Sequence, residues 1–100
     1  MLTTKRKKQM RAIGHHLKPI VLIGEQAITN GIIKELDRAL NDHELVKIKV
    51  SGERATRKTI LETLCYETRA ECIQSMGSSA LLFRPAHNPN PRLSNLIRPI

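Results

Sequence analysis

The chain has 100 residues and carries 17 Lys and Arg against nine Asp and Glu, a formal net charge of +8. This length fits one domain with one core, and the excess of cations favours a nucleic-acid partner, because clustered cations release counterions from phosphate chains. No run approaches the roughly 18 apolar residues of a membrane span, and the N-terminal sequence lacks the apolar segment of a secretion signal. We therefore expect a cytoplasmic protein without a membrane partner.

The first predicted elements are a helix and a short strand. Met10, Ile13 and Leu17 recur at helical spacing after a pair of threonines that can cap a helix, which predicts a helix over residues 4–16. The apolar run IVLI at residues 20–23 is too short for a helix and rich in branched side chains. It predicts a strand that is buried on both faces.

A second helix and strand follow. Apolar residues recur at helical spacing from Ile32, which predicts an amphipathic helix of about 13 residues that ends near His43 and is capped by Thr29 or Asn30. The alternating sequence LVKIKV at residues 45–50 predicts a strand with an apolar face and a cationic face. The apolar face holds Val46, Ile48 and Val50, and the cationic face holds Lys47 and Lys49.

The remaining pattern predicts a third helix and a hairpin. We expect residues 55–68 to form a helix that buries Ile60 and Leu64, and residues 71–76 and 79–84 to form strands around a two-residue Gly-Ser connection. The element order αβαβαββ predicts an α/β fold. Strands joined by helices favour parallel neighbours, with the second and third helices on one face of the sheet.

The last part of the chain differs in composition. Four of the five prolines lie from residue 85 onward, together with most of the asparagines. We expect a domain over residues 2–86 and a flexible tail over residues 87–100.

Few residues support catalysis or a cofactor. Cys65 and Cys72 lack the spacing of a zinc or redox site, so both are interpreted as buried thiols. Tyr66 and Phe83 are the only aromatic residues and are assigned to the core. The histidines show no metal spacing and no pairing with a nucleophile. We expect no enzyme activity, cofactor or small-molecule substrate.

Cations concentrate in two parts of the chain. Residues 1–18 carry six cations and no acid, and residues 45–69 carry six cations and three acids. Arg54, Arg57 and Lys58 lie at the start of the third helix, where the helix dipole disfavours cations but free amide groups can bind phosphate. We expect the first helix, the second strand and the start of the third helix to meet as one cationic wall.

These features together resemble a known family. The element order, the strand-to-helix turn after VLIG, the strand LVKIKV, the basic helix start and the closing LLFRP are similar to the CRM domain of chloroplast RNA splicing and ribosome maturation proteins, in its stand-alone YhbY-like bacterial form. The resemblance covers residues 2–86. It implies a mixed four-stranded sheet similar to the C-terminal domain of translation initiation factor three. It also implies binding of ribosomal RNA in precursors of the large ribosomal subunit, without catalysis.

The resemblance also implies a role for the turn after the first strand. The family carries a GxxG loop there, which lets an RNA backbone approach closely. This chain has Gly24, Glu25, Gln26 and Ala27 instead, so the second glycine is replaced and an acid occupies a position that often holds a cation. The candidate RNA-binding residues are Lys5, Lys8, Arg11, Lys18, Gly24, Gln26, Ala27, Lys47, Lys49, Arg54, Arg57, Lys58 and Arg84.

Two other functions remain open from the sequence. A DNA-binding regulator would prefer duplex DNA, although strands between the helices argue against a helix-turn-helix. A protein-docking module would associate in a salt-tolerant way through an apolar patch or through the apolar residues near the C-terminus.

Overall fold

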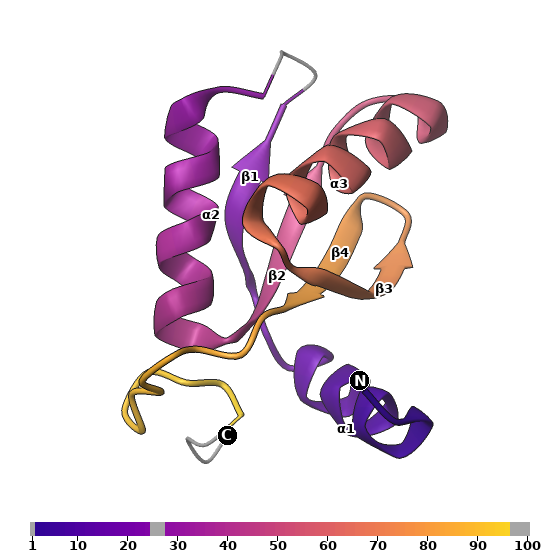
Figure 1. Cartoon of the computed structure of the whole chain (residues 1–100). Coiled ribbons are helices and arrows are strands. Elements are labelled where there is room, and N and C mark those ends of the chain that lie inside the picture. Colours follow the sequence, from indigo (N-terminus) through magenta and orange to yellow (C-terminus); the bar gives the residue numbers. More distant parts are fainter. Residues whose placement is uncertain (1, 25–27, 97–100) are drawn as a thin grey trace.

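The computed structural model describes residues 2–24 and 28–96, and its elements follow the predicted order αβαβαββ (Figure 1). They are α1 (Thr4–Gly14), β1 (Pro19–Ile23), α2 (Asn30–His43), β2 (Leu45–Val50), α3 (Arg54–Thr68), β3 (Glu71–Met76) and β4 (Ser79–Phe83). Thr3 caps α1 and Thr29 caps α2, each accepting a backbone hydrogen bond on its hydroxyl. The predicted α/β class and four-stranded mixed sheet are confirmed.

The strand order is β1-β2-β4-β3, with β1 parallel to β2 and the other two pairings antiparallel. The prediction that successive strands are parallel neighbours is therefore right for β1 and β2 and wrong for β2 and β3. Gly77, at φ +57, turns the chain tightly after β3. The returning strand β4 pairs with the free edge of β2 and separates it from β3.

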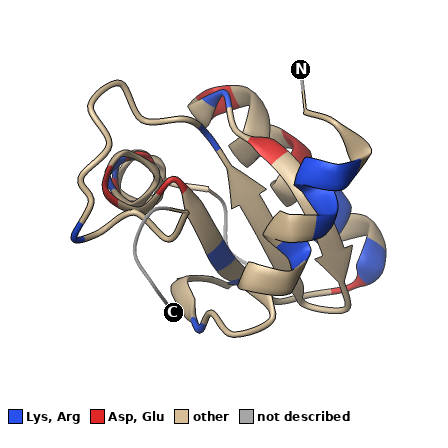
Figure 2. Cartoon of the chain, turned by 90° about the horizontal axis from the view of Figure 1, so that it is seen from below, with Lys and Arg blue, Asp and Glu red and all other residues tan. Residues whose placement is uncertain are grey.

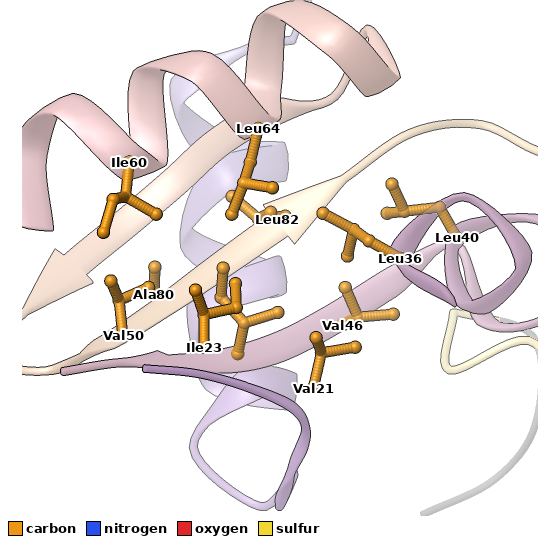
Figure 3. Close-up of a cluster of buried hydrophobic side chains, with 11 residues drawn as sticks. Val21, Ile23, Leu36, Leu40, Val46, Val50, Ile60, Leu64, Ala80 and Leu82 are labelled. Carbon is orange, nitrogen blue, oxygen red and sulfur yellow. The ribbon is translucent and has the colours of Figure 1, made fainter. Parts of the chain in front are cut away.

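The main core lies between the sheet and helices α2 and α3 (Figure 3). Leu36 and Leu40 point inward from α2, and Ile60 and Leu64 point inward from α3. The strands contribute Val21, Ile23, Val46, Ile48, Val50, Ala80 and Leu82. Both helices thus cover one face, as predicted, and burial of this apolar area is the main stabilising contribution.

Helix α1 packs on the opposite face of the sheet and forms a second, smaller core. Met10 contributes to this core from α1, together with Leu45, Ile73 and Leu81 from three strands. A Cβ atom at Gly14 would lie 2.5 Å from Cδ2 of Leu81, so the glycine permits close approach of the helix to β4. Helix α1 contacts β2 and β3 and leaves part of this face uncovered.

Strand β1 is not buried on both faces, which corrects the sequence prediction. Val21 and Ile23 are buried under the helices, but Ile20 is 45% exposed and Leu22 is 71% exposed. The reason is that β1 lies at the edge of the sheet, beyond the part that α1 covers.

Two assignments from the sequence are also wrong. Tyr66 is not in the core, because its side chain lies on the outer side of α3 and is 83% exposed. Cys72 is exposed and Cys65 is half-buried. Partial burial raises the pKa of Cys65 to about 11 and also raises that of Cys72, so both are protonated near pH 7. Phe83 packs against the second core, as predicted.

Arg84 joins three elements just after β4. Its guanidinium donates to Oδ1 of Asp37 at 2.5 Å and to the backbone oxygens of Asp37 and Thr68 at 2.9 and 2.8 Å. A fourth hydrogen bond reaches Asn41 at 2.9 Å. The planar fork of arginine therefore ties the C-terminal half of α2 and the end of α3 to the sheet.

The segment after β4 has no helix or strand in its described part, residues 87–96, but it contacts the domain. Ser94 and Asn95 are buried. The Ser94 hydroxyl donates to Oε1 of Glu44 at 2.7 Å, and the Asn95 amide donates to the backbone oxygen of Leu45 at 2.7 Å. The sequence did not anticipate these contacts beside the end of α2 (Figure 1).

Replacing Gly14 with valine should destabilise the fold, because a branched side chain would be forced into Leu81. We expect Gly14→Val to lower the free energy of unfolding by about 2 kcal/mol and the melting temperature by about 10 °C. Gly24→Ala is the matched control, since a Cβ atom there has nothing within 4 Å. Thermal unfolding followed by circular dichroism measures both, and an unchanged melting temperature in Gly14→Val would contradict the close approach of α1 to β4.

Replacing Arg84 with lysine should also destabilise the fold, because an ammonium group cannot satisfy four acceptors on α2 and α3 at once. We expect Arg84→Lys to lower the free energy of unfolding in urea by about 2 kcal/mol. Arg38→Lys, at an exposed position on α2, is the control and should change stability by less than about 0.5 kcal/mol. Equal stability of the two variants would show that the Arg84 contacts contribute little.

Candidate nucleic-acid interface

Helix α1 carries a ridge of cations on its solvent side. Lys5, Lys8 and Arg11 are spaced three residues apart, so they share one side of the helix. Met10 and Gly14 occupy the buried side. The helix that follows the N-terminus in Figure 2 carries several Lys and Arg and no acid, whereas α2, seen end-on, shows both signs of charge. The charged side chains of α1 itself are therefore all positive, and Lys7 among them pairs with Glu71 of β3 at 3.5 Å.

A hollow of about 470 Å³ lies between α1 and the uncovered part of the sheet. Arg11 and His15 line it from the helix, and Lys47, Gln74 and Met76 line it from the strands. A cation from β2 and one from α1 thus face the same space. This geometry brings together two of the predicted basic elements.

The second strand presents both of its lysines on the face that α1 occupies. Val46, Ile48 and Val50 point to the opposite face, into the main core, so the alternation predicted for LVKIKV is confirmed. Lys47 is half-buried beside the hollow, and Lys49, one row further from α1, is exposed.

The start of α3 forms a second cationic group. Arg54, Arg57 and Lys58 line a hollow of about 910 Å³ between this helix and the β3–β4 hairpin. The first turn of α3 contains no acid, and the side chain of Glu53 makes no capping hydrogen bond. The free amide groups and the dipole of this helix end therefore add to the positive charge. Arg57 also donates to the backbone oxygen of Gly52 at 2.6 Å, which holds the turn before the helix.

The structure divides the predicted residues between the two faces of the sheet and does not form one wall. Lys47 and Lys49 lie on the α1 face, whereas α3 packs on the other face. Both hollows nevertheless border the start of β4, because Ser79 and Ala80 line both of them. The cations therefore flank one end of β4 from both sides of the sheet.

Other predicted residues have different placements. Lys18 is exposed just before β1, next to the pairing of Pro19 with Lys47. Gly24 is exposed just after β1, where Ile23 pairs with the last residue of β2. The chain therefore leaves β1 at the same end of the sheet at which it leaves β2 toward α3. Gln26 and Ala27 lie outside the described residues.

Arg84 does not join either cationic group. Its side chain is 17% exposed, and its guanidinium is occupied by acceptors on α2 and α3. The sequence placed it correctly at the end of a strand but gave no sign of partners more than 40 residues away.

Four residues beside the cationic groups were not predicted from the sequence. His15 and Gln74 line the hollow beside α1, and Leu22 and Met76 expose apolar side chains on the same face of the sheet. Strand order and the extent of α1 decide these placements. Neither follows from local patterns.

The described residues contain neither a cluster of metal ligands nor a membrane-spanning helix. Within them, no group of three or more His, Cys, Asp or Glu side chains is arranged to hold a metal ion. None of the helices in residues 2–24 and 28–96 has the length and apolar character needed to cross a bilayer.

The chain is similar to several known proteins. It is 47% identical to a probable RNA-binding protein of Pseudomonas aeruginosa over 98 residues, which cover 97% of this chain and 94% of the relative. It is 38% identical to an RNA-binding protein of Haemophilus influenzae over 93 residues, covering 92% of this chain and 94% of that one. A solution structure from Staphylococcus aureus superposes with a TM-score of 0.75 at 35% identity, covering 88% of this chain and 93% of the other.

The family profile of the CRS1/YhbY (CRM) domain matches residues 2–84, nearly the whole range over which the sequence motifs predicted it. The match includes α1, the loop after β1, the alternating strand β2 and the basic start of α3. The chain therefore belongs to the CRS1/YhbY (CRM) domain family.

Proposed function

We propose that this protein binds RNA through the two cationic groups that flank the start of β4. The observation that carries the proposal is the shared border of the two hollows, since Ser79 and Ala80 connect cations of α1 and β2 with those of α3. A phosphate chain that passes over this border meets positive charge on both sides. Relatives that match almost the full chain are named RNA-binding proteins, which supports the same partner.

We further propose that the RNA is ribosomal and is bound in precursors of the large ribosomal subunit, in the cytoplasm. The resemblance of the motifs to the YhbY-like form of the family supports this target. The basic charge of this small domain suits a factor that binds a phosphate chain. The proposed role is to assist assembly by holding a folded RNA segment, without catalysis.

Two other functions are less well supported. A DNA regulator usually places a recognition helix in the major groove, whereas the most basic helix here, α1, packs its buried side on a sheet and no helix-turn-helix is formed by the described elements. A protein-docking module would not require cations at a helix N-terminus, where they oppose the dipole.

Neutralising two cations of α3 should weaken RNA binding. We expect Arg54→Gln/Lys58→Gln to lower affinity about tenfold at moderate salt and to reduce the slope of log affinity against log salt by about two, because two phosphate contacts are lost. Arg57 is left intact because it holds Gly52. Fluorescence anisotropy with a structured RNA fragment measures the effect.

A matched control separates this surface from net charge. Lys34→Gln/Arg38→Gln removes the same charge from exposed positions on α2, away from both hollows. We expect a loss of less than about twofold for this pair, because only the long-range field changes. Equal losses in the two double variants would remove the start of α3 from the interface. The pair Lys8→Gln/Lys49→Gln tests the α1 face in the same way.

The ribosomal target is tested in cells by crosslinking the protein to RNA and sequencing the attached fragments after separation of ribosome precursors from mature particles. We expect fragments of large-subunit RNA, enriched in precursor fractions and depleted for Arg54→Gln/Lys58→Gln. Enrichment of messenger or transfer RNA would contradict the ribosomal target while leaving RNA binding intact. A competition of duplex DNA against structured RNA excludes or supports the DNA alternative.

A further inference from the structure

The uncovered part of the sheet carries an ordered row of side chains. Leu22 pairs with Lys49 between β1 and β2, Lys49 pairs with Ser79 between β2 and β4, and Ser79 pairs with Met76 between β4 and β3. Directly paired residues point to the same face of a sheet. One row therefore crosses all four strands with the sequence of side chains apolar, cationic, hydroxyl, apolar. We call these four residues the open row.

The open row is unusually apolar at its two ends. Four large hydrophobic residues are exposed among the described positions, and three of them, Ile20, Leu22 and Met76, lie on the sheet face that α1 leaves uncovered. Leu22 is 71% exposed and Met76 is 68% exposed. Single exposed apolar residues are common, but a group on one face indicates a contact surface.

The reason for this exposure is the short reach of α1. The helix covers Leu45, Leu81 and Ile73, which lie nearer the other end of the sheet. Leu81 shares its row with Lys47 and Gln74 at the border of the hollow, and the open row lies beyond it. Along β4 the face thus changes from the buried Leu81 to the partly exposed Ser79, two residues away.

The charges around the open row indicate which partner fits it. Lys49 lies inside the row, and Lys47 and Arg11 lie beside it. A second copy of this chain would bring like charges together, and the chain has a net charge of +8. A polyanion with apolar groups is complementary to the lysines and to the exposed apolar side chains. Unpaired nucleotides are such a ligand, because they combine phosphates with flat, apolar base faces.

We propose that the open row binds unpaired bases of RNA, with Leu22 and Met76 contacting base faces and Lys49 contacting a phosphate between them. Three strand spacings span about 14 Å, which is the length of about four stacked nucleotides. Methionine sulfur and methyl groups make favourable contacts with aromatic rings, so aliphatic side chains replace the aromatic platform that this chain lacks. This proposal rests on the proposed RNA-binding function and assigns a subsite and a ligand form to it.

The first experiment compares a single-stranded RNA of about 12 nucleotides with the same strand annealed to its complement. We expect Leu22→Thr/Met76→Thr to bind the single strand about tenfold more weakly, while binding of the duplex and the salt slope stay unchanged. Threonine suits exposed strand positions, so the fold should be kept. Tyr66→Gln, which removes the fourth exposed hydrophobic residue from α3, is the control and should bind both RNAs as the parent does.

The second experiment observes the contact directly. In a protein with ¹³C-labelled methionine methyl groups, the resonance of Met76 should shift on addition of the single strand, while that of the fully buried Met10 stays in place. An oligonucleotide with the same backbone but without bases should shift Met76 far less, because the ring current of the bases is missing.

The outcomes separate this proposal from the broader one. Unchanged single-strand binding in Leu22→Thr/Met76→Thr, or an equal Met76 shift with the abasic strand, overturns the open row as a base-binding site and leaves RNA binding through the cationic groups intact. A parent protein that binds neither RNA overturns both proposals. Concentration-dependent dimers that disappear in Leu22→Thr/Met76→Thr, seen by sedimentation, would assign the open row to a second copy of the chain and overturn this proposal.

Discussion

The alternation of strand β2 is the constraint on which the rest of the molecule depends. This strand pairs with β1 along one edge and with β4 along the other, so its register is fixed by both neighbours. Val46 and Ile48 enter the core under α2 and α3, while Lys47 and Lys49 point to the face of α1. A slip of one residue would bury both lysines and expose the valines, so the core fixes the position of the charges.

Helix α1 decides how much of the second face remains accessible. It is anchored at one end of the sheet by Met10 and by the contact of Gly14 with Leu81. No second helix covers that face within the described residues, so the hollow beside Arg11 and Lys47 follows from the length and the position of α1. A longer or shifted helix would produce a larger core and remove the candidate interface.

Much of the fold follows from local patterns in the sequence. Helical spacing located the three helices, and the sequence LVKIKV located both the strand and its two faces. The order of the strands did not follow, because insertion of β4 beside β2 depends on pairing between distant residues. The four apolar residues of β1 are typical of a strand buried on both faces, but they also fit an edge strand that is buried on one face. Only the place of β1 at the edge of the sheet exposes Leu22.

The candidate site was predicted only in part, because contacts between residues distant in the sequence do not follow from local patterns. Basic residues in α1, β2 and α3 were recognised from charge alone, but charge does not show which face of the sheet each one occupies. Arg84 illustrates the limit, since its side chain is held by Asp37 and Thr68 on two helices, contacts that only the tertiary fold creates. The family motifs correctly indicated the fold, yet the division of cations between the two faces depends on how α1 and α3 pack against the sheet.

The two kinds of surface have different physical ranges, and this difference links the cationic groups to the open row. Attraction by Arg54, Lys58 and the α1 cations extends over about 8 Å at physiological salt and acts on any phosphate chain. Contact with Leu22 and Met76 requires removal of water from the apolar surface and therefore acts only on groups that lie directly on the sheet. A paired helix keeps its base faces stacked inside and cannot make such contacts. Charges spread over both faces would thus bring RNA to the protein, and the open row would favour segments whose bases are free.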